Sequence, residues 1–358
     1  MQIFPAIFRI TTLFLLLQKN DFVSSFAPHS SNRQSNINIS TTDNRLAKVN
    51  DFHAEITNIR SASATHVGVD PDSAGKVNQD ASFYFELDDG SNNPRYLCGA
   101  VLDGHGKKGH VLNEFLQWKL PSLLKSNLIS ETMDDDIENV LVRSFEDAHY
   151  EARMNETVPA ARSGTTCACT VVDIKSGIIH AANVGDSRAI MVIETLDSLK
   201  KKVFALTTET TTKLDEERDR IENADGRIDG SGNVWYGPVG IAMTRALGDS
   251  VMMRAGVLAT PVVTEFHLQK ECAKFLEESA NENFRIRIII ASDGIFDVMK
   301  NEEVNDFLGA CIQRGCTLEE GCELLVEEAR TRWQAGLSLE VRIDDATVVA
   351  FEFEYLHR

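Results

Sequence analysis

The chain has 358 residues, 43% of them hydrophobic, so it can bury a sizeable core as one large domain or two small ones. Its 54 acidic residues outnumber its 36 basic residues, and the net charge of −18 argues against nucleic acid as a partner, because phosphate backbones bind basic patches. The acidity is either a solvated surface or, in part, a set of carboxylates gathered around cations.

The first 45 residues are predicted to be a disordered leader that directs the protein to a compartment. Arg9 precedes a short apolar stretch, residues 10–17, which is too brief to span a bilayer. Val23-Ser24-Ser25 then offers small residues at a cleavage point, and residues 26–42 are rich in Ser, Asn and Thr without an acid. This order predicts a signal peptide followed by a transit peptide.

Two interpretations of the leader are open. Phe26-Ala27-Pro28 resembles the signal-peptide junction of proteins sent to the secondary plastids of some algae. Lys19 and Asp21 instead favour a disordered leader without a targeting role, in a protein of the cytoplasm. No other segment of the sequence approaches the length of a membrane span, so we expect none in the mature chain.

The globular part is predicted over residues 53–356 and opens with two strands. Residues 81–85 form the first predicted strand, and Asp80 stands at its beginning. An apolar run without charge, residues 96–102, predicts a buried strand that ends at Asp103-Gly104-His105-Gly106. Asp-Gly is an ordinary turn signal, but a strand end also holds a side chain rigidly where a loop leaves it accessible.

Between residues 110 and 155 the spacing of apolar residues becomes helical. Val111, Phe115 and Leu116 predict one amphipathic helix, which Pro121 should end or kink. A second helix is predicted from a longer apolar stripe, formed by Ile137, Val140, Leu141, Phe145, Ala148 and Ala152.

A hairpin is predicted next, from two apolar runs at residues 167–172 and 178–184 around a Gly-containing turn. The second strand then meets Asp186 and is predicted to continue to Ile193. The seven cysteines show no Cys-x-x-Cys spacing, which disfavours a zinc site or a disulfide framework. We expect these thiols to be buried or free.

The last third of the chain begins with a polar, Gly-rich excursion, residues 206–260, which contains a charged helix near residues 214–223. Residues 285–291 are the clearest strand, and Asp293 and Asp297 follow its end. Two helices come next, the second with a Thr317/Glu320 capping box. Asp344 then leads into a last strand, residues 346–351.

Aspartates therefore recur at the ends of predicted strands: Asp80, Asp103, Asp186, Asp293 and Asp344. Converging carboxylates raise one another's pKa and cost stability, so their convergence implies divalent cations. Oxygen ligands without a His/Cys cluster select Mg²⁺ or Mn²⁺ over Zn²⁺. Two such ions would fit a site that activates water and neutralises a phosphoryl group.

Short motifs at these positions resemble, in their order, the metal-dependent protein phosphatase family, the PPM class or type 2C serine/threonine phosphatases. They are Asn78-Gln79-Asp80, Asp103-Gly104-His105-Gly106, Ser163-Gly164-Thr165-Thr166, Gly185-Asp186-Ser187-Arg188-Ala189, Met243-Thr244-Arg245-Ala246-Leu247-Gly248-Asp249, Ala291-Ser292-Asp293-Gly294-Ile295-Phe296-Asp297-Val298 and Asp344-Asp345-Ala346-Thr347-Val348. Each motif is weak alone, but the ordered set is specific.

The resemblance implies an α+β fold, with two antiparallel sheets packed as a sandwich between helix pairs. It also implies hydrolysis of phosphoserine and phosphothreonine in phosphoprotein substrates, by attack of a hydroxide that bridges two metal ions. Residues 206–260 would form the variable flap beside the active site. We expect a monomer.

The resemblance also assigns residues. Asp80, Asp103, Asp293 and Asp344, with the backbone carbonyl of Gly104, match the ligands of two Mg²⁺ or Mn²⁺ ions, and Asp103 matches the ligand that bridges both. Asp186 and Asp297 match acids of a third, weaker metal site or of water contacts around the ions. His105 matches the proposed general acid for the leaving oxygen.

The chain departs from the family pattern beside this site. The phosphate-anchoring Arg is replaced by Gly75, and the adjacent Lys76 could bind phosphate only as a point charge without a bidentate fork. Further departures are Gln79 for an acid, Glu209-Thr210 for Asp-His and Asp345 for Asn. The core carboxylates remain, so we expect activity, and the alternative is a catalytically weak or silent phosphatase-like regulatory protein.

Overall fold

The computed structural model describes residues 54–72, 75–88, 94–130, 136–196, 200–276, 283–335 and 342–357. The predicted leader, residues 1–45, lies outside these ranges. The chain divides into two units, Met1–Ala47 and Lys48–Arg358, and the second carries every described helix and strand. No helix of the described residues is long and apolar enough to cross a membrane.

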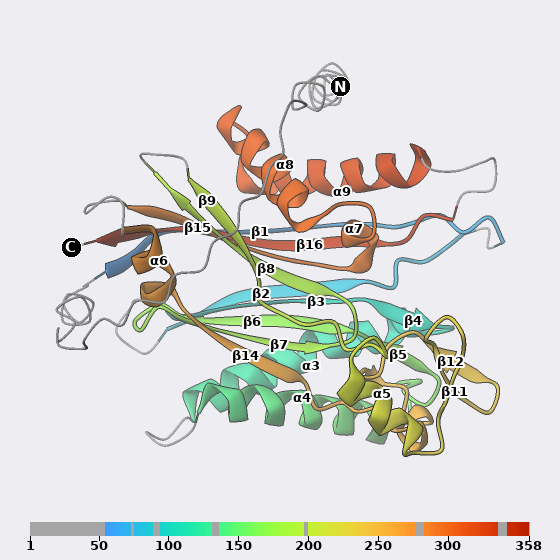
Figure 1. Cartoon of the computed structure of the whole chain (residues 1–358). Helices are drawn as coiled ribbons and strands as arrows, with labels where there is room; N and C mark the ends of the chain where they lie inside the picture. The colour runs from blue at the N-terminus through green and yellow to red at the C-terminus, as the bar shows by residue number, and fades with distance from the viewer. Residues whose placement is uncertain are drawn as a thin grey trace, which may run out of the picture. The chain divides into compact units, whose positions relative to one another are not determined.

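Two five-stranded antiparallel sheets form the centre of the second unit (Figure 1). The first sheet has the spatial order β1 (Ala54–His66), β16 (Ala346–His357), β15 (Phe284–Ala291), β8 (Arg188–Thr195) and β9 (Lys201–Ala205). The second sheet has the order β14 (Val262–His267), β7 (Ile178–Val184), β6 (Cys167–Asp173), β3 (Pro94–Leu102) and β2 (Ala81–Asp88). The predicted α+β sandwich is confirmed.

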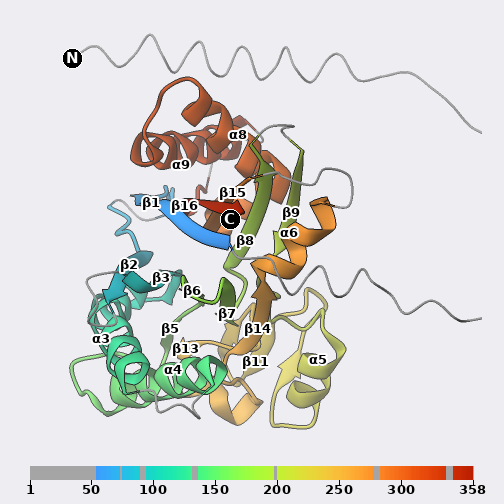
Figure 2. The same cartoon turned by 90° about the vertical axis from the view of Figure 1, so that its left-hand side faces the viewer.

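Helix pairs cover the outer faces of the sheets, as Figures 1 and 2 show. The first sheet carries α8 (Asn301–Gln313) and α9 (Leu318–Ala335), and the second carries α3 (Gly109–Ile129) and α4 (Ile137–Met154). The shorter helices are α5 (Asp215–Glu222), α6 (Leu268–Leu276), α7 (Asp293–Phe296) and the 3-10 helix η1 (Met252–Ala255). There are also two small three-stranded sheets. One has the order β13 (Leu247–Gly248), β5 (Ser163–Thr165) and β4 (Gly104–Gly106). The other has the order β10 (Arg227–Ile228), β11 (Val234–Tyr236) and β12 (Val239–Ile241).

Both faces of the central strands are buried, which explains their continuous apolar runs. Cys167 and Cys169 face the α3/α4 layer, whereas Ala168 packs between the sheets. On β3, Gly99 permits the sheets to approach closely, because a Cβ atom there would lie 2.5 Å from the Phe351 ring. The described cysteines are free and mostly buried, as expected.

Helix α3 continues through Pro121, so of the two predicted effects of this proline, an end or a kink, the end of the helix is excluded. Its buried face is an unbroken i, i+4 stripe: Leu112, Leu116, Leu120, Leu124 and Leu128. An interior proline costs about 3 kcal/mol, and each fully buried leucine contributes about 1.5–3 kcal/mol. Burial of Leu124 and Leu128 beyond the proline therefore offsets the lost hydrogen bond.

The predicted single strand through Asp186 is also wrong. Strand β7 ends at Val184 in the second sheet, and β8 starts at Arg188 in the first. Gly185, with φ of 97°, makes the turn, and a Cβ atom there would lie 2.6 Å from Thr166 Cβ. The chain crosses between the sheets at this point.

Several other predictions are confirmed. The hairpin is β6 and β7, the charged helix is α5, and α4 buries the predicted stripe. The capping box precedes α9, where the Thr317 N–H donates to Glu320 Oε2 (2.8 Å) and the Glu320 N–H donates to Thr317 Oγ1 (3.1 Å). The elements β1, β9, β14 and α6 have no counterpart among the predictions.

Candidate active site

Antiparallel pairing brings the strand-end aspartates to one edge of the two sheets. Ala81 of β2 pairs with Leu102 of β3, so Asp80 before one strand lies beside Asp103 after the other. In the facing sheet, β15 ends at Ala291, next to the start of β16, so that Asp293 and Asp344 meet in the same way. Asp186 lies in the crossing between the sheets. All five predicted strand-end aspartates therefore lie at the same end of the two sheets.

The carboxylates are close enough to alter one another's ionisation. Burial raises the pKa of Asp103 well above its usual range, and the charges of Asp80, Asp293 and Asp344 add to the rise. Burial and the neighbouring charges of Asp186 and Asp344 raise the pKa of Asp293 to about 8. Divalent cations bound between these carboxylates would lower their pKa values again.

Asp80 has one oxygen fixed by the protein and one without a partner. Burial raises its pKa to about 7, while the Ser292 hydroxyl, which donates to Oδ2 at 2.8 Å, opposes the rise. The Ser292 oxygen in turn accepts a hydrogen bond from the Thr347 N–H (3.0 Å). Asp80 Oδ1 is buried and has no hydrogen-bond partner. The second oxygen is therefore left for a ligand.

A buried carboxylate oxygen without a partner is costly, and a divalent cation is the ligand that suits it. Like Asp80 Oδ1, Asp293 Oδ1 and Asp186 Oδ1 are buried and have no hydrogen-bond partner. In the described residues, no three His, Cys, Asp or Glu side chains already enclose one ion position. The fit to Mg²⁺ or Mn²⁺ therefore rests on donor chemistry and unsatisfied oxygens, not on a preformed coordination shell.

The acids matched to a third metal site lie beside Glu209. Burial raises the pKa of Asp186, and the charges of Glu209 and Asp297 raise it further. Partial desolvation, followed by the charge of Glu209, also raises the pKa of Asp297, although this residue remains accessible to solvent. Glu209 itself forms an ion pair with Arg188. The sequence marked Glu209 only as a departure from a pattern, whereas the structure adds it to this acidic group.

His105 is held by an aspartate that was assigned no role from the sequence. His105 Nε2 lies 2.5 Å from Oδ2 of Asp249, whose side chain is 2% exposed. Burial lowers the pKa of His105, but the hydrogen bond and charge of Asp249 outweigh burial and raise it. A Cβ atom at Gly164 would lie 2.0 Å from Asp249 Oδ2, so a glycine is needed there. The sequence signal that could have identified Asp249 was the family motif of residues 243–249, which ends at this aspartate.

Lys76 lies beside the carboxylates but is already paired. Its Nζ atom is 2.9 Å from Asp345 Oδ1 and 3.3 Å from Asp344 Oδ1. Burial lowers the pKa of Lys76, while Asp345 and Asp344 raise it and prevail. Asp345 also accepts the backbone N–H groups of Gly68 (2.6 Å) and Gln79 (2.9 Å). Asp345 therefore joins the loops around the site.

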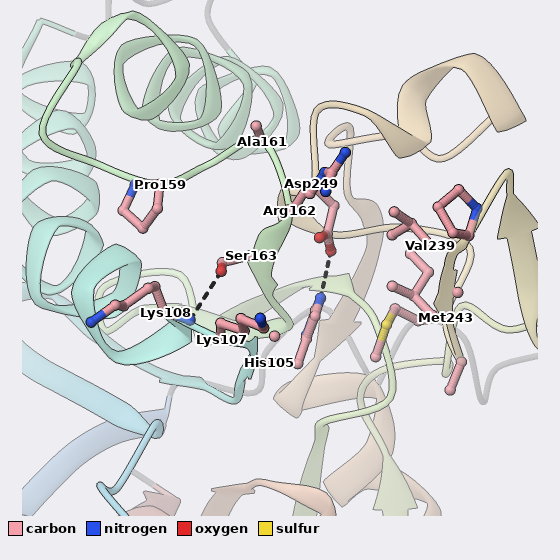
Figure 3. A pocket seen from close by; sticks show the side chains of 15 residues that line it. His105, Lys107, Lys108, Pro159, Ala161, Arg162, Ser163, Val239, Met243 and Asp249 are labelled. Atoms are coloured by element: carbon pink, nitrogen blue, oxygen red, sulfur yellow. Dashed lines mark hydrogen bonds and ion pairs between the residues drawn. The ribbon is translucent and has the colours of Figure 1, made fainter.

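A cavity of about 780 Å³ opens beside His105 and Asp249 (Figure 3). Lys107 and Lys108 line it from the segment after β4, and Pro159 and residues 161–163 line it from the segment that enters β5. The excursion contributes residues 238–243 to the cavity. The predicted flap thus reaches the candidate general acid.

The sequence profile of the family described as "Protein phosphatase 2C" matches residues 76–334. "Probable protein phosphatase 2C 61" of Arabidopsis thaliana is 30% identical over 322 residues, which are 86% of this chain and 88% of that protein. "Probable protein phosphatase 2C 48" of Oryza sativa subsp. japonica is 28% identical over 311 residues, 77% of this chain and 80% of that protein.

Solved structures with the same fold include the serine-threonine phosphatase 2C from Toxoplasma gondii. It has a TM-score of 0.64 and 16% identity, and the match covers 84% of this chain and 98% of that one. A C. elegans sex determining protein has a TM-score of 0.62 and 20% identity, with 83% of this chain and 65% of that one covered. At these identities the likeness concerns the fold alone.

Proposed function

The chain belongs to the protein phosphatase 2C family, and we propose that it is a metal-dependent serine/threonine phosphatase that acts on phosphoproteins. One observation carries the proposal: Asp80, Asp103, Asp293 and Asp344 gather at one sheet edge with unsatisfied carboxylate oxygens and raised pKa values among them. Such a group of acids is unfavourable without cations.

Asp80, Asp103, Asp293 and Asp344, with the Gly104 carbonyl, would hold two Mg²⁺ or Mn²⁺ ions, and Asp103 would bridge them. When bound, the ions lower the pKa of water and offset charge on the phosphoryl oxygens. The Ser292 hydroxyl holds Oδ2 of Asp80, which fixes the rotation of that carboxylate. Asp186 and Asp297 are proposed for a third, weaker ion or for water contacts.

His105 is the proposed general acid. The alkoxide of a departing serine or threonine needs a proton, and a positioned acid typically contributes 10²–10⁴-fold to such a step. Asp249 favours the protonated imidazole and orients its ring through the 2.5 Å contact. The side chain of His105 is 24% exposed, so a substrate in the adjoining cavity can reach it.

Lys76 is proposed to attract the phosphate group, although its pairing with Asp345 and Asp344 limits this role. The same pairing favours a second candidate function, a catalytically weak or silent regulatory protein that binds metal ions. Both functions use the carboxylate site. Turnover separates them.

The test is hydrolysis of a phosphothreonine peptide by the full chain with Mg²⁺ or Mn²⁺, with and without a chelator. We expect metal-dependent turnover that Asp103→Asn reduces by about 10²–10³-fold, the scale of losing one electrostatic contact to the transition state. Asp147→Asn, an exposed acid on α4, is the matched control. Activity that persists in chelator would contradict the mechanism, and metal binding without turnover would establish the regulatory alternative.

We further propose that the leader, residues 1–45, is a signal peptide followed by a transit peptide for a secondary plastid. The support is its composition and the Phe26-Ala27-Pro28 junction. Residues 1–45 fused to a fluorescent reporter should reach a membrane-bounded compartment. A diffuse cytosolic signal would favour the alternative location in the cytoplasm.

A further inference from the structure

Three cations line the cavity beside His105: Lys107, Lys108 and Arg162. All three residues are exposed. Within the described ranges no salt bridge joins any of their side chains to an acid. The chain as a whole has a net charge of −18, so this group of cationic side chains makes the charge around the cavity opposite in sign to that of the whole chain.

The cavity holds little negative charge to balance them. Asp249 is the one acid among its described lining residues, and its carboxylate is buried and bonded to His105. Opposite the lysines, Val239 and Met243 of the excursion form an apolar wall (Figure 3). Apolar walls of low dielectric constant strengthen the attraction between a concave cationic surface and an anion.

We propose that this cavity selects substrates that carry acidic residues close to the phosphorylated serine or threonine. The inference rests on the proposed phosphatase function, because it places the flanking peptide next to the group that protonates the leaving oxygen. An extended peptide rises about 3.3 Å per residue, so residues within two or three positions of the phosphorylated one can reach the cations. The occupant is thus an acidic phosphopeptide segment.

The experiment compares phosphothreonine peptides that differ only in three flanking residues on either side: aspartate, alanine or lysine. For the wild-type chain with Mg²⁺ or Mn²⁺, we expect kcat/KM to fall from the aspartate to the lysine series, with aspartate about 3–10-fold above alanine. Salt should compress this ratio, because the Debye length falls to about 3 Å at 1 M ionic strength.

The variant that tests the site combines Lys107→Gln, Lys108→Gln and Arg162→Gln. We expect its aspartate-to-alanine ratio to fall to about one. Lys175→Gln is the control, because this exposed lysine lies in the β6–β7 turn, at the opposite end of the sheet from Asp186. Its ratio should match that of the wild type. Thermal unfolding of each variant checks that the fold is intact.

Outcomes for the proposed function and for this inference are separate. If no peptide is hydrolysed, the phosphatase function fails, and fluorescence anisotropy with labelled versions of the same peptides then measures the preference by binding. Equal rates, or equal affinities where turnover is absent, for aspartate and lysine peptides would overturn the inference. A triple variant that retains the wild-type ratio would overturn it too.

Discussion

The first sheet buries charge in two ways that have opposite consequences. Beneath α8, Arg287 and Glu352 are almost fully buried and satisfy each other, with Arg287 Nε 3.0 Å from Glu352 Oε2 and Nη1 2.6 Å from Asn305 Oδ1. At the sheet edge, Asp293 meets other acids, its pKa rises to about 8, and one of its oxygens has no partner. A buried charge that is paired within the protein stabilises the fold. A cluster of acids with an unpartnered oxygen is suited to binding a cation.

The largest expected effect tests the paired region. Glu352→Gln keeps the shape of the side chain but leaves Arg287 buried without its counter-charge, and breaking such a pair costs about 3–5 kcal/mol. Urea unfolding of the full chain measures the change. Glu354→Gln, two residues along β16, should shift stability by about 0.5 kcal/mol or less. Equal effects of the two substitutions would contradict the structural importance of the buried pair.

The next effect concerns the ion pair that lies within the site. His105→Gln should reduce turnover of a phosphothreonine peptide by at least about 10²-fold, because the alkoxide then leaves without its proton. The loss should be smaller on an aryl phosphate, whose phenolate is a better leaving group. Asp249→Asn should give the same pattern in weaker form, since it loosens the 2.5 Å contact. Equal losses on both substrates would remove the general-acid role.

At the unpaired edge, removing charge should have the opposite sign from Glu352→Gln. In chelator, Asp293→Asn should raise the free energy of unfolding by about 1–2 kcal/mol, because it removes a carboxyl group whose ionisation is disfavoured by burial and by the charges of Asp186 and Asp344. Its Mg²⁺ affinity should fall in parallel. Asp147→Asn on the outer helix should change neither quantity measurably. If Asp293→Asn lowered the free energy of unfolding in chelator, Asp293 would stabilise the fold as the buried Arg287–Glu352 pair does.

The smallest effect is a dependence on pH. Asp80 and Asp293 titrate at about 7 and about 8 in the folded chain but near 3.8 when unfolded, so the folded state binds more protons between these values. The stability of the metal-free protein should therefore fall as pH rises from 6.5 to 8.5, by about 1–1.5 kcal/mol per pH unit.

Burial lowers the pKa of His149 to about 4 and also lowers the pKa of His180. Both oppose the slope only near the lower end of this window, because an unfolded imidazole loses its proton near pH 6.5. Urea unfolding at several pH values, with and without saturating Mg²⁺, measures the slope. Bound metal ions should flatten it, and Asp293→Asn should reduce it. A stability that rises over this window in chelator would show that these carboxyl groups are ionised in the folded state.

Much of the fold was predictable because its signals are local. The apolar runs of β3 and β15, the stripe of α4 and the Thr317/Glu320 capping box each lie within a few residues and follow from side-chain periodicity or turn chemistry. Strand β1 gave no such signal. Its sequence is largely polar, and Asn58 has a φ of 53° beside a register shift. Its place depends on pairing with β16, almost 300 residues away.

The same limit applied to the site. The sequence alone determined which residues carry carboxylates at strand ends, because each of these positions is set by a strand and the turn beside it. Tertiary structure decided their partners: His105 meets Asp249 from 144 positions away, and Lys76 meets Asp345. It also gathered Lys107, Lys108 and Arg162 around one cavity. Local periodicity fixes the direction of a side chain, whereas its neighbours depend on how distant strands and loops pack.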